Sequence, residues 1–373
     1  MPINMYDPTR DYKSHKDEYN NSINEVLNKG NFINGQQVKD IESKLCEYVD
    51  STNCICVGNG TDALQIALMA VDIEHGDEVI TVPYTWISTA EVITLLGAKP
   101  VFIDINKDTF CMDESLIEDA ITKKTKAIMP VSLYGSMPNY DKINEIANKY
   151  GIPVIEDAAQ SFGSTVNDKK SCNLTTIGCT SFFPTKPLGC YGDGGAIFTN
   201  DKELADKIRS IKNHGALKRF HHNYIGVNSR LDTIQAAVLN IKLKYFDTSL
   251  INRQHVAKTY CDKLCHLKDI KLPKIQKNST SAWAQFTITL PNNINRDEMV
   301  KQLKENGINV AIFYPMVLHQ QECFKYLNCD DSSFPVSIYI SEHVINLPCY
   351  GELTNDEIDT ITTVFIDVYN KLL

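Results

Sequence analysis

Between residues 54 and 200, short apolar runs alternate with segments whose apolar residues recur every three or four positions. The apolar runs predict strands, and the recurring pattern predicts helices between them. The predicted strands are 54–59, 77–84, 99–105, 126–135, 152–159, 179–183 and 195–200, and the first helices are 62–70, 88–96 and 139–150. Continuous apolar strands joined by helices are typical of an α/β fold with a mostly parallel central sheet covered by helices on both faces.

After residue 200 the pattern changes. Helices are predicted at 201–214, 231–246 and 251–266, followed by a strand at 284–290 and by helices at 296–306 and 354–372, with a loop at 274–280. We therefore expect a large domain over 1–245, which includes an N-terminal helical segment, and a smaller C-terminal α+β domain over 246–373. Ligands of such sheets collect beyond the carboxyl ends of the strands, so the chemistry is expected there.

Composition narrows the class of protein. The 373 residues carry a net charge of −9, which argues against a nucleic-acid surface. No apolar run approaches the roughly 20 residues of a membrane span, and the polar start of the chain lacks the order of a signal peptide. The 12 cysteines are scattered, and Cys54 and Cys56 are too close together for a metal pair, so reduced thiols and no metal are expected. These features indicate a soluble, cytoplasmic protein.

One lysine stands on an unusually restrained stretch. Lys186 lies between Pro184 and Pro187, and glycines follow at 189, 192, 194 and 195. A residue before proline is pushed to extended backbone, and glycines let other groups approach closely. A solvated lysine needs neither feature, whereas a lysine that forms a Schiff base must hold its amine in a fixed place.

Three further stretches lie at predicted strand ends. The turn GNGTDAL, with Gly60 and Thr61, runs into a helix whose free N–H groups favour a phosphate, although a glycine turn is also ordinary architecture. In VIEDAAQ, strand alternation sends Glu156 and Asp157 to opposite faces, so one acid can face the ligand edge or merely pack. In PYTWIST, Trp86 offers either a core side chain or a flat wall for a ring.

Taken together, the motifs GNGTDAL, PYTWIST, EDAAQSFGS, SFFPTKPLGCYGDGGAI, NHG and GVNSRLDTIQAAVL resemble the DegT/DnrJ/EryC1/StrS family of sugar aminotransferases. Members are fold-type I enzymes that depend on pyridoxal 5′-phosphate. The resemblance implies that Lys186 forms the Schiff base and then shuttles a proton, and that Asp157 pairs with the pyridine nitrogen. It implies that Trp86 stacks on the ring. The positions implied to hold the phosphate or flank the ring are Gly60, Thr61, Gln160 and Ser181.

The resemblance also implies a homodimer with shared active sites. Asn228 matches a residue that reaches the cofactor phosphate from the neighbouring subunit, and Arg230 lies in the same motif. Tyr314 matches a substrate-side position that is also contributed across the dimer. The family suggests L-glutamate as amino donor. Because a general base must be neutral part of the time, Lys186 is expected to have a depressed pKa.

The sugar substrate is less clear from the sequence. The resemblance favours a 4-keto-6-deoxyhexose linked to UDP or dTDP, with a UDP-linked 3-keto-hexose or 3-keto-hexuronate as the alternative. A uronate carboxylate is best bound by a cationic side chain. Family members that act on UDP-linked 3-keto-hexuronates are expected to carry an extra basic residue where this chain has Tyr224. Two other hypotheses are weaker. The first is removal of a sugar hydroxyl, but family members with that activity have histidine in place of the lysine. The second is a cofactor-binding regulator without turnover, which would not need the whole set of residues.

Overall fold

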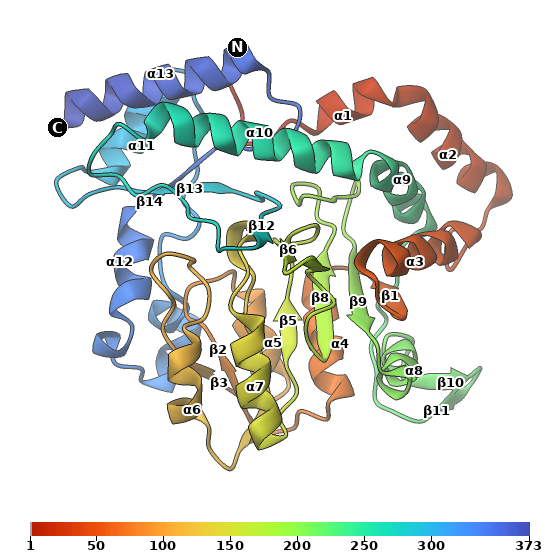
Figure 1. The fold of residues 1–373 in the computed structure, drawn as a ribbon. Helices are drawn as coiled ribbons and strands as arrows, with labels where there is room; N and C mark the ends of the chain where they lie inside the picture. Colours follow the sequence, from red (N-terminus) through yellow and green to blue (C-terminus); the bar gives the residue numbers. More distant parts are fainter. Residues whose placement is uncertain (1) are drawn as a thin grey trace.

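The computed structural model describes residues 2–373 (Figure 1). The strands of the large domain are β1 (Asn53–Val57), β2 (Glu78–Thr81), β3 (Lys99–Phe102), β4 (Thr125–Ile128), β5 (Ile155–Asp157), β8 (Ile177–Ser181) and β9 (Gly195–Thr199). The order β1-β9-β8-β5 continues into β4-β2-β3 through parallel bridges from Ile128 to Val154 and from Val131 to Asp157. Only β9 is antiparallel to its neighbours, so the predicted mostly parallel sheet is confirmed.

Helices cover both faces of this sheet. One face packs against α4 (Gly60–Ala70), α5 (Ser88–Leu95) and α8 (Lys202–Ile211), whose apolar residues join Ile55 and Ile197 in one buried cluster. Cys54 and Phe198, which alternate with those residues along β1 and β9, lie in a second cluster with α3 (Gln36–Val49) and α9 (Thr233–Lys244). Helix α7 (Tyr140–Tyr150) packs with residues of β2 and β4 in a third. Alternation along the strands therefore supplies an apolar residue to each face.

The C-terminal part forms a smaller α+β unit. Strands β13 (Phe286–Thr289) and β14 (Val344–Leu347) pair antiparallel and pack with α11 (Arg296–Glu305) and α13 (Asn355–Leu372). Helix α10 (Phe246–Leu264) runs across the upper part of the molecule in Figure 1, below α13. Its Phe246 is buried in the core of the large domain, whereas Val256, Tyr260 and Leu264 are buried in the core of the smaller unit.

The boundary predicted at 245/246 coincides with the junction of α9 and α10, but the two units are interleaved in the chain. Ile3 bridges to Ile308 and is buried in the small core. In the opposite direction, Val317 and Ile340 pack in a cluster of the large domain, although their numbers fall in the C-terminal part. Helix α12 (Pro335–His343), which carries Ile340, has no counterpart in the elements predicted from sequence.

The remaining elements are short or lie at the start of the chain. Helices α1 (Pro8–Ser14) and α2 (Lys16–Lys29) form the N-terminal segment, and α6 (Ile117–Ala120) precedes β4. The short strands are β6 (Thr165–Val166), β7 (Lys169–Lys170), β10 (Ala216–Lys218), β11 (His221–His222) and β12 (Ser279–Thr280), the last inside the predicted loop. Short 3₁₀ helices occur at Glu114–Leu116, Leu133–Gly135, Leu318–Gln320, Glu322–Leu327 and Asp331–Ser333. Within residues 2–373, no helix has the length and apolar character needed to cross a bilayer.

Candidate active site

Lys186 lies on the turn after β8. Its backbone N–H donates to the Phe183 carbonyl at 2.9 Å, which closes the turn that contains Pro184. A Cβ on Gly189 would lie 2.6 Å from that same carbonyl oxygen, so only glycine permits the next tight bend. The side chain of Lys186 is half-buried. Burial lowers the pKa of its amine, and the Asp157 carboxylate partly opposes that shift.

Asp157 ends β5 on the side of the sheet that faces Lys186. Its Oδ2 accepts a hydrogen bond from Thr89 Oγ1 at 2.8 Å, and its Oδ1 accepts one from the Ala159 N–H at 3.2 Å. The residue is 5% exposed, and this burial raises the pKa of the carboxyl group although both hydrogen bonds and Lys186 favour the charged form. A positive group close to Asp157 would therefore lower the cost of its ionisation.

Glu156 points to the opposite face, as strand alternation predicts. Its carboxylate accepts from Ser132 Oγ at 2.9 Å, Ser171 Oγ at 2.7 Å and the Cys172 N–H at 2.8 Å. Those hydrogen bonds join the strand to the 132–134 and 171–172 loops. Glu156 thus has a structural role, and Asp157 is the acid that lies beside Lys186.

The start of α4 forms an anion cradle. Asn59 caps the helix by accepting from the Asp62 N–H at 2.8 Å, which leaves the N–H groups of Gly60 and Thr61 without a partner among the described residues. A Cβ on Gly60 would meet Ser181 Cβ at 2.7 Å, so Gly60 is in close contact with the end of β8. Thr61 Oγ1 is 2.7 Å from Ser88 Oγ. Free N–H groups, hydroxyls and the positive helix end together suit a phosphate.

Trp86, Gln160 and Tyr314 lie together at the edge of the site. Trp86 is 58% exposed, which excludes the core interpretation, and its ring centroid is 6.0 Å from that of Tyr314. Gln160 Nε2 donates to the Tyr314 hydroxyl at 3.1 Å. The expectation that Tyr314 is contributed across a dimer is therefore wrong: Tyr314 packs against residues of its own chain beside Asp157.

Asn228 and Arg230 are placed differently. The Asn228 side chain is exposed to solvent, and Arg230 is half-buried. Between them, Ser229 Oγ accepts from the Gly58 N–H at 2.8 Å and donates to Asp62 Oδ2 at 2.6 Å, which fixes this segment against the start of α4. The Asn228 side chain makes no hydrogen bond to Lys186 or Asp157 of its own chain.

Several side chains of the site were not singled out from the sequence. Thr89 donates a hydrogen bond to Asp157, Ser88 shares one with Thr61, and Ser229 donates one to Asp62 at the start of α4. Ser88 and Thr89 belong to PYTWIST, where a hydroxyl pair after the tryptophan was an available signal. Tyr84 bonds to the Tyr314 N–H and the Phe313 carbonyl, and Tyr134 bonds to the same carbonyl. The two tyrosines follow different strands, and no local pattern indicated this shared contact.

These residues fit pyridoxal phosphate part by part. The free N–H groups at Gly60 and Thr61 and the adjacent Ser181 suit its phosphate, and the absence of a Cβ at Gly60 lets Ser181 lie against the helix start. Asp157 suits a protonated pyridine nitrogen, since burial makes a cationic partner favourable. Lys186 offers an amine with a lowered pKa, and the exposed face of Trp86 offers a flat surface.

Comparisons with known proteins agree with this assignment. The model of the DegT/DnrJ/EryC1/StrS aminotransferase family matches residues 13–365. The chain is 48% identical to the UDP-2-acetamido-2-deoxy-3-oxo-D-glucuronate aminotransferase of Pseudomonas aeruginosa, over 93% of this chain and 94% of that protein. A DegT DnrJ EryC1 StrS aminotransferase from Brucella abortus superposes with a TM-score of 0.94 at 38% identity, covering 98% of this chain and 99% of that one.

A further solved structure bears on the cofactor. NtdA from Bacillus subtilis, determined with bound cofactor PMP, has a TM-score of 0.88 and 31% identity, covering 96% of this chain and 82% of that one. PMP is the amine form of pyridoxal phosphate. The chain thus belongs to the DegT/DnrJ/EryC1/StrS aminotransferase family and is a pyridoxal-phosphate-dependent sugar aminotransferase.

Proposed function

We propose that the protein transfers an amino group from L-glutamate to C3 of a UDP-linked 3-keto sugar, with a 3-keto-hexuronate as the first candidate. The 48% identity to the Pseudomonas aeruginosa aminotransferase over almost all of both chains carries this proposal. It corresponds to the alternative substrate considered from the sequence rather than to the favoured one.

Basic residues on the segment that carries β10, β11 and Arg230 support a substrate with a carboxylate. The segment from β10 to β11 carries Lys218, Arg219, His221 and His222, all exposed, and Arg230 follows on the same segment. A planar guanidinium can bind a carboxylate in a bidentate manner. Tyr224 stands where a cationic side chain is expected for such a substrate, but the guanidinium of Arg219 or Arg230 can take the place of that cation.

A neutral 4-keto-6-deoxyhexose linked to UDP or dTDP is the second candidate. Tyr224 is the observation that favours it, because an aromatic side chain there suits a sugar without a carboxylate. The two candidates differ in one charge, so they are separable by a direct substrate screen.

The residues of the chain would divide the chemistry as follows. Pyridoxal phosphate, when bound, supplies a reactive carbonyl and an electron sink. The start of α4 with Ser181 would hold its phosphate, and Gln160 and Trp86 would flank its ring. The buried Asp157 carboxylate would keep a positive charge on the pyridine nitrogen. Lys186 Nζ, whose pKa is lowered by burial, would in its neutral form accept a proton from the amine-bearing carbon of the donor and later donate a proton in the transfer to the keto sugar.

A homodimer is part of the proposal. Large apolar side chains are exposed on the segment that carries Asn228: Leu217 is 60% exposed, Phe220 79% and Ile225 89%. Such side chains beside an exposed functional asparagine favour a second copy of the chain as their partner. In that arrangement Asn228 would complete the phosphate site of the neighbour.

The decisive experiment is a half-reaction screen. The purified protein, loaded with pyridoxal phosphate, is mixed with UDP-3-amino-hexuronate, UDP-3-amino-hexose, or UDP- and dTDP-4-amino-6-deoxyhexoses, and its absorbance is followed. We expect conversion to the pyridoxamine form with the 3-amino sugars and with L-glutamate. Conversion by the 4-amino-6-deoxy sugars alone would favour the second candidate, and no conversion by any amino sugar would overturn both.

A further inference from the structure

A chain of hydrogen bonds connects two tyrosines of the large domain to Tyr314. The backbone N–H of Tyr134 donates to Gln160 Oε1 at 2.8 Å, and the Tyr84 and Tyr134 hydroxyl oxygens are 2.8 Å apart. Both tyrosines are buried, and neither belongs to the groups assigned above to the cofactor. The network therefore needs an explanation of its own.

The first consequence concerns the amide of Gln160. A carboxamide has an accepting end and a donating end, and a backbone N–H can bond only to the accepting end. Because Tyr134 N–H occupies that end, the NH₂ group must face Tyr314, 3.1 Å away. The orientation of Gln160 is thus set by a backbone group and not by the ligand.

The second consequence concerns the hydroxyl of Tyr314. It accepts from Gln160, so its own proton remains to be donated. Among the described residues no acceptor for that proton is present, and its ring lies beside the exposed Trp86. Burial raises the pKa of Tyr314, so the hydroxyl keeps its proton at neutral pH. Tyr314 is a hydrogen-bond donor directed at the ligand side.

The peptide between Phe313 and Tyr314 is held from two sides. Its carbonyl accepts from Tyr84 at 2.7 Å and also from the Tyr134 hydroxyl, while the Tyr314 N–H donates to Tyr84 at 3.0 Å. In the preceding peptide, the Phe313 N–H donates to Asn346 Oδ1 of the small unit at 2.9 Å, and Asn346 Nδ2 donates to Thr287. Each donor and acceptor of this peptide is therefore fixed by a buried side chain.

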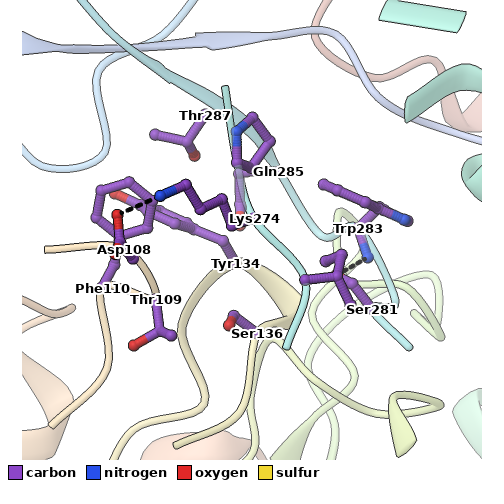
Figure 2. A pocket seen from close by; sticks show the side chains of 12 residues that line it. Asp108, Thr109, Phe110, Tyr134, Ser136, Lys274, Ser281, Trp283, Gln285 and Thr287 are labelled. Atoms are coloured by element: carbon purple, nitrogen blue, oxygen red, sulfur yellow. Dashed lines mark hydrogen bonds and ion pairs between the residues drawn. The ribbon is translucent and has the colours of Figure 1, made fainter. Parts of the chain in front are cut away.

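The ring of Tyr134 is packed independently of its hydroxyl. It meets Phe110 edge to face, with centroids 5.5 Å apart, and it lines a cavity of about 20 Å³ shared with Trp283, Gln285 and Thr287 (Figure 2). Such a cavity holds about one water. Removing the hydroxyl of Tyr134 would thus leave the ring in place and change mainly the contacts with the Phe313 carbonyl and the Tyr84 hydroxyl.

We propose that Tyr84 and Tyr134 are positioning residues, which fix the Phe313–Tyr314 peptide so that Tyr314 donates its hydroxyl proton to an oxygen of the sugar substrate. The proposal rests on the sugar aminotransferase function given above. It predicts that the two tyrosines matter for the reaction with the sugar and not for the reaction with L-glutamate.

The test measures the two half-reactions separately in Tyr84→Phe and Tyr134→Phe. The substrate is the nucleotide sugar that converts the wild-type protein. The matched control is Tyr260→Phe, because Tyr260 is equally buried and donates to the Pro348 carbonyl at 2.8 Å away from this network. Loss of one positioning hydrogen bond is worth about 1 kcal/mol, so kcat/KM for the sugar should fall about three- to tenfold in Tyr134→Phe, mainly through KM. The fall should be at least as large in Tyr84→Phe, which loses two bonds to the peptide. The glutamate half-reaction and the control should stay within about twofold.

A double-mutant cycle separates positioning from general destabilisation. In a Tyr314→Phe background, Tyr134→Phe should cause no further loss with the sugar, because the group through which it acts is gone. Additive losses, or equal losses in both half-reactions, would overturn the proposal.

Binding gives a readout without turnover. In a Trp283→Phe background Trp86 is the single tryptophan, and its fluorescence can follow titration with UDP-N-acetylglucosamine, which has no keto group. We expect Tyr134→Phe to weaken this binding severalfold and Tyr260→Phe to leave it unchanged; equal affinities would contradict the proposal. A wild-type protein that converts no amino sugar would instead overturn the proposed function.

Discussion

Lys186 and Asp157 form a pair in which burial disfavours the charged form of each partner. The pKa of the lysine is lowered and that of the aspartate is raised, although each charge favours the other. Burial of these two ionisable groups therefore destabilises the folded protein when no ligand is present, as is common at functional sites.

Replacing Lys186 with alanine should abolish transamination and leave the fold intact, because the amine is needed for covalent attachment and proton transfer. Circular dichroism should match that of the wild type, and borohydride should no longer trap the cofactor on the chain. Measurable turnover by this variant without an added amine would count against the role of Lys186.

Replacing Asp157 with asparagine should also remove turnover, but it should stabilise the cofactor-free protein at neutral pH. The carboxyl pKa is raised on folding, so the unfolded chain ionises first, near pH 3.9, and stability falls as pH rises through the folded pKa. The melting temperature of the variant should exceed that of the wild type at pH 7.

The same comparison contains its own control. The advantage of the Asp157→Asn variant should shrink as the pH is lowered below about 4, and it should vanish well below that pH, where the wild-type carboxyl is protonated in both states. A difference that is independent of pH would mean that the carboxylate charge is not its cause.

At this scale the sequence was informative where one short stretch carried the signal. Lys186 between its prolines and Asp157 at a strand end could be predicted, because restrained backbone and strand alternation are local properties. The roles of Tyr84 and Tyr134 could not, because they depend on contacts with residues at least 50 positions away. The same holds for Tyr314, whose contact with Gln160 spans 154 positions.

Among the elements, the hairpin of β10 and β11 departs most from the sequence prediction. Its strands have three and two residues, too few for an alternating pattern to be read, and its apolar side chains point to solvent. Longer elements such as α4 and α7 were predicted within two residues at each end, because their apolar periodicity extends over several turns.

The hairpin gives a test of the proposed dimer. Replacing Phe220 with aspartate places a charge on a side chain that is 79% exposed in the single chain. If a second copy covers it, burial of the charge should weaken association by more than about tenfold and lower activity with it. Sedimentation over a range of concentrations measures the first effect and transamination the second.

Leu95→Asp is the matched control, because Leu95 on α5 is 68% exposed and lies on a different segment. It should leave association and activity unchanged. A Phe220→Asp variant that associates like the wild type would show that this side chain is outside the interface.

On the scale of the whole molecule, the order of domains along the chain was only partly predictable. The change of pattern near residue 245 falls between α9 and α10, but Ile3 and Ile340 pack with the unit that their numbers do not suggest. Such interleaving depends on tertiary contacts between segments that are far apart in the sequence, and hydrophobic periodicity does not encode these contacts.

Helix α10 has a consequence for how the protein unfolds. Its first turn is part of one core and its last turns are part of the other, so melting either core frays the helix that the other needs. We expect calorimetry of the cofactor-free protein to give a single cooperative transition. Asn252→Pro, at an exposed site between the two buried ends of α10, should cost about 3 kcal/mol and split the transition in two. Two transitions in the unaltered protein would mean that the cores melt independently, whereas one transition makes a single helix the mechanical link that keeps both halves of the enzyme folded together.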